Sequence, residues 1–481
     1  MGVGNHATIA TDTPTVAQQI GRFAVDAAFD DIPGYALHRL KCNLLDSFAC
    51  ALGALAGPPI GRLRAQTERF GGNPMSSLIG GGQTAPDRAA AFNTALTRYL
   101  DFMDSFMTKG ETCHPSDNIG SILAAGESAG RDGREFLTDL AVAYEIECRL
   151  TEAIPIMNAG FDHTTQLGLS IAAAVARAIG ADAEATANAV AIAASDFSSL
   201  AVIRASPTSE WKGFASSGMA FAAVHSSFLA AAGTTGPLAV FEGPKGFFHA
   251  VGQKAEVDWS DRALDAVLDT SLKKHNAEVH TQTALDGILE LRAEHGFGAD
   301  DVESVEVEVF LTAYDIVGGG QYGDRQTVET KEQADHSLPY MIAVAILDGE
   351  VMPEQFRPER IPQADVQALL RRIYVRPHSR ITRPKKLSER LDPYSRVYPQ
   401  EMPATVSVRL KDGRTVSVER RSYQGFHDDP MPWPNVEAKL ERLGEHALTA
   451  SERRSLVEAV GDLETIELGE LTDLLRAARL P

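Results

Sequence analysis

Apolar side chains recur at three- and four-residue spacing through the first half of the chain, which is the period of amphipathic helices. Alanine, the best helix former, is abundant between the larger apolar residues. Residues 14–265 are therefore predicted to be overwhelmingly helical. The clearest segments are Tyr35–Leu55, Arg134–Leu150, Gln166–Ile179 and Ala183–Leu200.

The pattern changes near residue 268. Val302–Leu311 alternates strictly between apolar and polar residues, which predicts a half-buried strand. Thr405–Leu410 and Arg414–Arg420 flank a Lys-Asp-Gly turn, which predicts a hairpin. Helical patterns lie between these strands, and the chain is helical again from about Pro434. The intervening helices are expected at His280–His295, His336–Leu347 and Gln363–Arg372.

These patterns predict a mainly α protein with an inserted α+β domain. A large helical domain is built from both chain ends, residues 1–267 and 426–481. Residues 268–425 form a smaller α+β lid. A cleft between two such domains is a favoured place for a small-molecule site.

The net charge of the chain limits the classes of partner that it is expected to bind. The 481 residues include 45 basic and 65 acidic side chains, which gives a formal net charge of −20. Such a chain repels phosphate backbones, so nucleic acid and anionic membranes are not expected as partners. An anionic substrate would require local cations at its site.

The cysteines and the apolar stretches indicate the cellular compartment in which the protein is expected. The four cysteines form no Cys-x-x-Cys pair and fit a reducing cytoplasm. The start of the chain, MGVGNHATIATDT, lacks the features of a signal peptide. Ala183–Ile203 and Gly218–Phe241 are alanine-rich and interrupted by polar residues, so we interpret them as helices buried in protein. A cytoplasmic protein without a membrane span is expected.

The first chemical cluster spans Asp101–Ser105 and His114–Asn118. Its acidic and hydroxyl side chains stand at helical spacing on the end of an apolar helix, and the second run resembles a loop that enters another helix. Ser116 or Asp117 could simply cap that helix. Alternatively, a carboxylate and an imidazole converge near a helix N-terminus, where an anion binds and a proton moves. The residues alone leave both interpretations open.

Other polar clusters have the same ambiguity. Each could be a capped turn or a solvated lysine instead of part of a site. Lys212, which precedes Gly213 before an apolar helix, could hold a carboxylate. The remaining clusters are Gly160–Thr165, which contains His163, Lys273–Gln282, which contains His280, and Ala334–Tyr340, which contains His336 and Ser337.

Metal and nucleotide sites are not indicated. No HExxH or paired-histidine spacing is present, so neither a metal nor a cofactor is expected. Gly318–Gly323 lacks the Lys-Ser/Thr of a phosphate-binding loop and is interpreted as a flexible loop. Arg371–Arg396 holds nine Lys and Arg residues, which could steer an anion but fit a solvated lid surface better.

Several long motifs in order resemble the MmgE/PrpD family, from about residue 35 to 440. They are Tyr99–Ser105 with Thr112–Asn118, Gly160–Thr165, Lys-x-x-x-Ala-Glu-x-His-x-Gln at Lys273–Gln282, Ala-Asp-His-Ser-x-Pro-Tyr at Ala334–Tyr340 followed by Leu-Asp-Gly, and Asp429–Trp433. The chain departs from the pattern at Ser105, where others have Thr, and after Lys273, where many have an aromatic residue and a Pro.

The resemblance implies a homodimer that acts on a small polycarboxylate. Family members include 2-methylcitrate dehydratase, cis-aconitate decarboxylase and iminodisuccinate epimerase. The implied active-site positions are Asp101, Ser105, His114, His163, Lys212, Lys273 and Tyr340. Proton transfer is assigned to Asp101 and His114, with His163 and Tyr340 as further donors. Charge stabilisation is assigned to Lys212 and Lys273. Substrate binding is assigned to Ser105, Lys212, Lys273, His280 and His336.

The expected function is a metal-independent hydro-lyase that dehydrates 2-methylcitrate or a similar tricarboxylate. Two alternatives stay open. A decarboxylase or epimerase of a small di- or tricarboxylate could use the same scaffold. A helical dimer that binds metabolites without catalysis is the third possibility.

Overall fold

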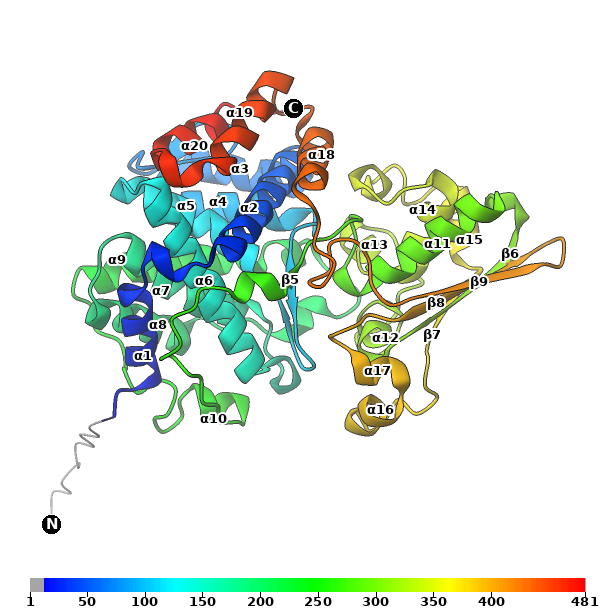
Figure 1. The fold of residues 1–481 in the computed structure, drawn as a ribbon, viewed down its shortest axis with the longest axis horizontal. Coiled ribbons are helices and arrows are strands. Elements are labelled where there is room, and N and C mark those ends of the chain that lie inside the picture. The colour runs from blue at the N-terminus through cyan, green and yellow to red at the C-terminus, as the bar shows by residue number, and fades with distance from the viewer. Residues whose placement is uncertain (1–12, 481) are drawn as a thin grey trace, which may run out of the picture.

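The computed structural model describes residues 13–480. The first twelve residues, which carry most of the start judged to lack a signal peptide, lie outside the described residues, as does residue 481. The described chain is mainly helical, with small sheets, as the sequence predicts (Figure 1).

The first part of the chain is almost entirely helical. Several helices begin with a capping box, as α1 does at Thr15 and Gln18 and α6 at Asp132 and Glu135. The helices are α1 (Val16–Asp26), α2 (Gly34–Ala54), α3 (Pro58–Phe70), α4 (Pro86–Tyr99), α5 (Ile119–Ala129), α6 (Gly133–Ala153), α7 (Thr164–Ala178), α8 (Ala183–Asp196), α9 (Ala215–Ala231) and α10 (Phe247–Val251).

Short strands interrupt this helical part. The pair β1 (Ser76–Ser77) and β2 (Gln83–Thr84) is antiparallel. A second sheet has the order β4 (Thr112–Cys113), β3 (Ser105–Met107), β5 (Thr270–Ser271), all antiparallel. β5 lies just after residue 268, where the sequence pattern changes, so this sheet joins the start of the second part of the chain to the segment that precedes His114.

The second part contains a four-stranded sheet in the order β7-β6-β8-β9. β6 (Val302–Val309) pairs in parallel with β7 (Ile373–Pro377) and antiparallel with β8 (Ala404–Leu410). β8 and β9 (Thr415–Arg420) form the predicted hairpin. The helices are α11 (Gln282–His295), α12 (Leu311–Val317), α13 (Lys331–Ala334), α14 (Leu338–Asp348), α15 (Ala364–Leu370), α16 (Lys385–Leu391) and α17 (Pro393–Val397).

The last helices return to the first part of the chain. These are α18 (Trp433–Gly444), α19 (Ala450–Gly461) and α20 (Leu468–Arg476), and they pack beside α2 and α5 (Figure 1). Gly133 marks one docking point: its N–H donates to the carbonyl of Ile466, and a Cβ there would lie 1.7 Å from the carbonyl oxygen of Leu463. Only glycine permits this approach.

Two hydrophobic cores result. One contains buried residues from 17–272 and again from 431–478. The other contains residues 277–426 together with Met107 of β3. Met107 is notable because it belongs by sequence to the helical part but packs in the core of the α+β part. Phe106, the preceding residue of β3, lies instead in a small separate cluster with Cys113 and Cys148.

Several boundaries differ from the sequence prediction. The segment predicted to be helical to Leu200 ends at Asp196, and the strand from Val302 ends at Val309, where α12 follows. The stretch Gly218–Phe241 is not one buried helix: α9 ends at Ala231, and Phe221 and Leu229 are 40% and 44% exposed. Alanine-rich sequence predicts helix well, but it does not define which face is covered.

Within residues 13–480, no single helix is long and apolar enough to cross a lipid bilayer. α2 and α3, which meet at a bend of 89°, meet that criterion of length and composition only when they are taken together.

Candidate active site

Asp101 lies just beyond α4, in a left-handed turn. The helix ends at Tyr99, and Asp101 has a φ of 59°, a conformation that Asp tolerates better than most residues. The predicted helical spacing of Asp101, Asp104 and Ser105 is therefore wrong, because the turn ends the helix and Ser105 begins β3. In this conformation the Asp101 carboxylate lies beside the side chains of Arg98, Lys212 and Lys273.

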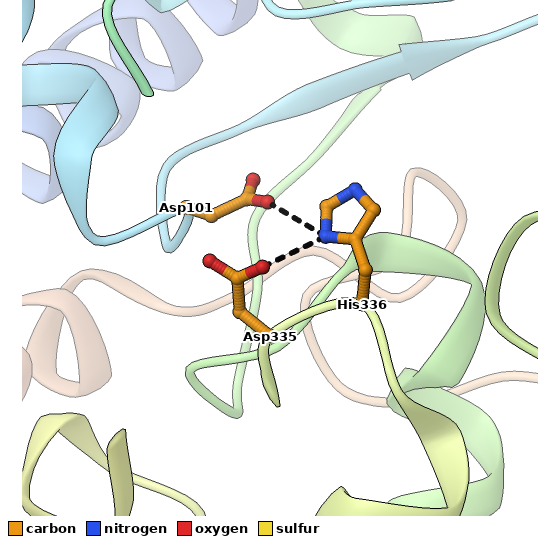
Figure 2. Close-up of side chains that lie close together, drawn as sticks. All are labelled: Asp101, Asp335 and His336. Atoms are coloured by element: carbon orange, nitrogen blue, oxygen red, sulfur yellow. Dashed lines mark hydrogen bonds and ion pairs between the residues drawn. The ribbon is translucent and has the colours of Figure 1, made fainter. Parts of the chain in front are cut away.

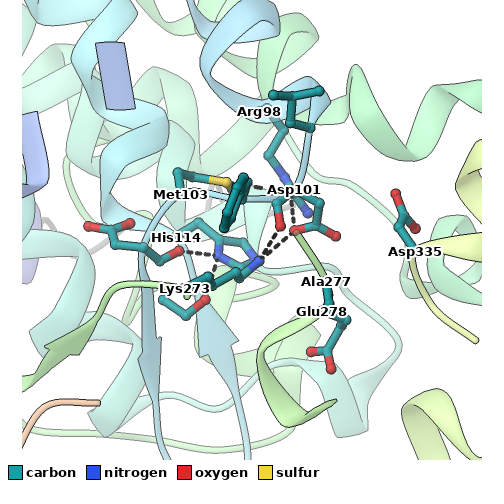
Figure 3. A network of polar contacts seen from close by, with 12 residues as sticks. Arg98, Asp101, Met103, His114, Lys273, Ala277, Glu278 and Asp335 are labelled. Atoms are coloured by element: carbon teal, nitrogen blue, oxygen red, sulfur yellow. Dashed lines mark hydrogen bonds and ion pairs between the residues drawn. The ribbon is translucent and has the colours of Figure 1, made fainter. Parts of the chain in front are cut away.

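Those three cations meet on one carboxylate. Oδ1 of Asp101 accepts hydrogen bonds from Nη1 of Arg98 at 2.6 Å and from Nζ of Lys273 at 2.8 Å (Figure 3). Oδ2 accepts from Nζ of Lys212 at 3.1 Å. Burial opposes ionisation of Asp101, but the charges of Arg98, Lys273 and Lys212 outweigh it and hold its pKa well below the usual range.

Asp335 extends this charge cluster. Its Oδ1 accepts from Lys212 at 2.6 Å, and its Oδ2 accepts from Lys331 at 2.8 Å. Burial raises the pKa of Asp335, but Lys212 and Lys331 reverse that effect and bring it far below its usual value. The lysines arrive from separate segments, so the cluster exists only in the folded chain.

Asp101, Asp335 and His336 form a group of side chains whose spacing could suit a cation. One ligand atom from each lies within 4.8 Å of the others (Figure 2). The ammonium of Lys212, however, already contacts both carboxylates. A metal ion bound by these three groups would have to displace that ammonium, so Lys212 supplies the positive charge at this point.

His114 follows β4 and is held by the preceding strand. Its Nδ1 lies 2.7 Å from the carbonyl oxygen of Asp104 and 3.1 Å from Oγ of Ser105. A carbonyl only accepts, so Nδ1 carries the proton and Nε2 carries a lone pair. Burial lowers the pKa of His114 well below its usual range, and the charges of Arg98 and Lys273 lower it further. The ring is therefore neutral, with a lone pair on Nε2.

The residues after His114 do not cap the following helix. Oγ of Ser116 donates to Asp104 at 2.6 Å, and Oγ of Ser216 donates to Asp117 at 2.6 Å. The predicted capping by Ser116 or Asp117 is wrong, since His114 itself occupies the N-cap of a short 3₁₀ turn that leads into α5. These side chains instead brace the segment that holds His114.

His163 begins α7 and has the opposite tautomer. Its Nε2 lies 3.0 Å from Nη2 of Arg204, and a guanidinium only donates, so Nε2 accepts and Nδ1 carries the proton. That Nδ1 is buried without a hydrogen-bond partner among the described residues. Burial, opposed by Asp162 and reinforced by Arg204, lowers the pKa of His163 to about 3. Its ring lies edge to face with His114, with centroids 5.1 Å apart.

Arg204 is itself fixed by Asp162. Nε and Nη2 donate to the two carboxylate oxygens at 2.7 and 2.9 Å, a bidentate pair that sets the plane of the guanidinium. Oδ1 of Asp162 also accepts from the backbone N–H of Thr164 at 3.2 Å. His163, not Asp162, occupies the N-cap position of α7, and its side chain makes no capping hydrogen bond.

His280 and His336 come from the second part of the chain. His280 lies between Oε1 of Glu278 at 2.7 Å and the hydroxyl of Tyr398 at 2.9 Å. Nδ1 of His336 lies 2.9 Å from Asp335, and burial with the charge of Lys212 lowers the pKa of His336 to about 4. Ser337, not His336, caps α14.

Five of the predicted site residues line one pocket between the two parts of the chain, and three more contact its walls. Asp101, His114, His163, His280 and His336 line it. Ser105, Lys212 and Lys273 hydrogen-bond to those residues. The other lining residues are Arg98, Thr112, Met157, Arg204, Glu278, Ile316 and Tyr322.

Tyr340 is placed elsewhere. Its ring packs in the second core against Phe356, and its hydroxyl donates to the carbonyl of Gln355. Tyr322 is the tyrosine that lines the pocket. It belongs to the glycine-rich loop that the sequence suggested was only flexible, where no polar pattern marked it.

Other residues of the site were also missed. Glu278 and Asp335 lie inside motifs that were recognised but were passed over beside their histidines. Arg98 stands one helical turn before Asp101, a spacing that could have suggested the pair. Arg204 had no sequence signal, because its partner Asp162 lies 42 positions earlier.

Fold and site together define a helical protein with an α+β part and a cation-rich pocket between them. The MmgE/PrpD N-terminal domain matches residues 18–260, and the MmgE/PrpD C-terminal domain matches residues 275–465. The chain belongs to the MmgE/PrpD family.

Its relatives include enzymes named 2-methylcitrate dehydratase. The Escherichia coli K12 protein is 28% identical over 349 residues, 69% of this chain and 71% of the relative. The Cupriavidus necator protein is 28% identical over 393 residues, 76% and 79% of the two chains. The mitochondrial protein of Yarrowia lipolytica is 25% identical over 440 residues, 86% and 81%. At the level of the family, these similarities support a dehydratase.

Proposed function

We propose that the protein is a hydro-lyase that removes water from 2-methylcitrate or a closely similar tricarboxylate. The observation that carries the proposal is the pair of opposite tautomers, an acceptor nitrogen on His114 and a donor nitrogen on His163, beside a buried cluster of cations. Elimination of water requires a base for a C–H proton and a donor for the departing hydroxyl.

The lone pair on Nε2 of His114 takes the proton from the carbon next to a carboxylate. The C–O bond to the neighbouring hydroxyl then breaks, and its oxygen receives the proton from His114, so that water leaves and the ring returns to neutrality. Nδ1–H of His163 hydrogen-bonds to that oxygen during departure. Tyr322, on the wall of the same pocket, is the candidate for a second donor.

Negative charge develops on the substrate carboxylate as the C–H bond breaks. Cations placed in advance in a buried site stabilise that charge without reorganisation. Lys212 and Lys273 are positioned next to the pocket by Asp101 and Asp335. Because these charges belong to the chain, the proposed reaction needs no metal, and turnover is expected to survive exhaustive chelation.

A substrate panel tests the proposal. Purified protein is incubated with 2-methylcitrate, citrate, cis-aconitate and iminodisuccinate, and products are followed by NMR. An alkene tricarboxylate from 2-methylcitrate or citrate is the expected product. Loss of carbon dioxide from cis-aconitate, or inversion of iminodisuccinate, would replace the dehydratase with a decarboxylase or an epimerase. Binding without turnover of any of the four acids would make the protein a non-catalytic binder.

The place of action is proposed to be the cytoplasm. All four cysteines are free thiols and buried, which is typical of a reducing compartment.

A further inference from the structure

Arg98 is a buried cation with donors that the protein does not use. Its side chain is 2% exposed, and Nη1 donates to Asp101 at 2.6 Å and contacts Sδ of Met103 at 3.8 Å. Nε is buried and has no hydrogen-bond partner among the described residues. The nearby carboxylate of Asp117 stays 3.8 Å from Nε, which is too long for a hydrogen bond.

The unused donors have a defined geometry. A guanidinium presents five N–H groups in a rigid plane, and Nε–H with the neighbouring Nη2–H forms one side of that plane. Within residues 13–480, the hydrogen bonds of Arg98 come from Nη1, so the donors on this side have no hydrogen-bond partner. A carboxylate fits it with two parallel hydrogen bonds.

Lys212 and Lys273, which lie beside Arg98, have fewer free hydrogen-bond donors to offer a carboxylate. Nζ of Lys212 is shared between Asp101 and Asp335, and Nζ of Lys273 between the carboxylate and the carbonyl of Asp101. An ammonium has three donors, so each lysine keeps one. Arg98 lines the pocket, whereas neither lysine does.

The charge balance of the cluster also favours an anion. Among the described residues, Arg98, Lys212, Lys273 and Lys331 donate hydrogen bonds to only two carboxylates, those of Asp101 and Asp335. Burial raises the pKa of the next carboxyl, Asp117, to about 6, so it is mostly ionised at pH 7, and the four cations still exceed the three carboxylates by one charge. A buried excess of positive charge is costly unless a ligand neutralises it.

We propose that Arg98 is the residue that binds a carboxylate of the substrate, through Nε and Nη2, and that it thereby selects polycarboxylates. The inference rests on the proposed function for the class of ligand. Asp101 holds the guanidinium from Nη1, which leaves the other side of the plane for the substrate.

Calorimetry with tricarballylate, a tricarboxylate that has no hydroxyl to lose, tests the binding role directly. Arg98→Lys keeps a positive charge beside Asp101 but removes the two parallel donors, Nε–H and Nη2–H. The affinity of this variant for tricarballylate should therefore fall at least tenfold. Arg98→Ala should lose binding, and added guanidinium ion should restore part of it. Arg177→Gln is the control, a partly buried arginine paired with the buried Asp139 outside the pocket, and its affinity should stay within twofold of wild type.

Steady-state kinetics supply the second measurement. KM for the turned-over acid should rise at least tenfold in Arg98→Lys, with a smaller fall in kcat. Folded Arg98 variants with wild-type affinity and KM would overturn the inference while dehydration stands. A different outcome is a wild type that turns over none of the four acids and still binds tricarballylate, with that binding lost in Arg98→Lys. This result would contradict the proposed dehydratase activity and support the binding role of Arg98.

Discussion

His114 and His163 lie edge to face, 5.1 Å apart between ring centroids, and hydrogen bonds hold them in opposite tautomers. The carbonyl of Asp104 fixes one ring and the guanidinium of Arg204 fixes the other. Both residues line the pocket, and in these neutral tautomers Nε2 of His114 is an acceptor and Nδ1 of His163 is a donor. This relationship gives each histidine a separate role that can be tested.

Replacement of His114 by Asn should separate catalysis from folding. The Asn amide can keep the hydrogen bond to the carbonyl of Asp104, but it removes the basic Nε2. Turnover should fall by about 10² to 10⁴, the contribution of one acid–base group, while the melting temperature changes little. NMR product formation and a thermal melt measure the two effects. Wild-type turnover in this variant would remove His114 from the mechanism.

The two tyrosines should respond differently to loss of the hydroxyl. Tyr322→Phe should lower kcat or raise KM, because its ring lines the pocket. Tyr340→Phe should leave kinetics unchanged and lower the free energy of unfolding by about 1 to 3 kcal/mol, because the buried carbonyl of Gln355 loses its donor. Denaturant melts and steady-state kinetics on both variants measure these effects. Reduced turnover in Tyr340→Phe with unchanged kinetics in Tyr322→Phe would show that Tyr340 is the active-site tyrosine.

Asp101→Asn should destabilise the fold as well as reduce turnover. Asn accepts a φ of 59° as readily as Asp, so the backbone is not strained. The lost charge leaves Arg98, Lys212 and Lys273 less compensated in the interior, which should cost about 3 to 5 kcal/mol in the free energy of unfolding. Asp412→Asn, in the exposed hairpin turn, is the control and should change it by less than about 0.5 kcal/mol. Equal effects of the two substitutions would contradict a buried charge cluster.

Glu111 should make stability depend on pH. Its carboxyl is buried, accepts from the N–H groups of Ile156 and Met157, and has a pKa raised to about 8, mainly by burial. The folded state therefore keeps the proton after the unfolded state has released it, so this contribution is complete below the unfolded pKa of 4.5 and is lost as pH rises to about 8.

Glu111→Gln removes that dependence and retains the acceptor for both N–H groups. The stability difference, wild type minus variant, should fall by about 1.4 kcal/mol for each pH unit between about 5 and 8. Urea melts of both proteins across this range measure it. A difference that stays constant with pH would show that Glu111 does not bind a proton in the folded state.

Exposed apolar side chains on one group of elements support the homodimer expected from the family resemblance, and we propose that they form its interface. Val202 is 69% exposed, Trp211 57% and Phe221 40%, and the segments that carry them contact one another. Phe221→Glu with Val202→Glu should shift the mass from dimer to monomer in light scattering. Tyr35→Glu, an exposed residue on α2, should not. A monomeric wild type at micromolar concentration would contradict the proposal.

Local sequence was enough for most elements of the fold. The helical period of α2, α6 and α7 and the alternation around the Lys-Asp-Gly turn predicted their elements to within a few residues, because each period is set by residues close together in the sequence. The family motifs likewise brought Asp101, His114, His163, Lys212 and Lys273 to attention before any contact was known.

The sequence could not show the turn at Asp101. Its polar residues keep a helical spacing, and only the contacts with Lys212 and Lys273, distant in the chain, favour the reversed backbone there. The sequence also could not show which of Tyr340 and Tyr322 belongs to the site, because this too depends on contacts between distant segments. A tyrosine inside a motif and one in a glycine-rich loop look alike until packing buries the first and turns the second to the pocket.

Residue types and their order along the chain thus determined the helices, the hairpin and a set of ionisable groups. The tertiary structure alone decided which nitrogen of His114 and of His163 carries a proton, and that Arg98 keeps donors free beside the pocket. Hydrogen-bond partners and burial set both properties, and the partner of His163, Arg204, lies 41 positions away in the chain. Periodicity and local motifs carry no information about such contacts.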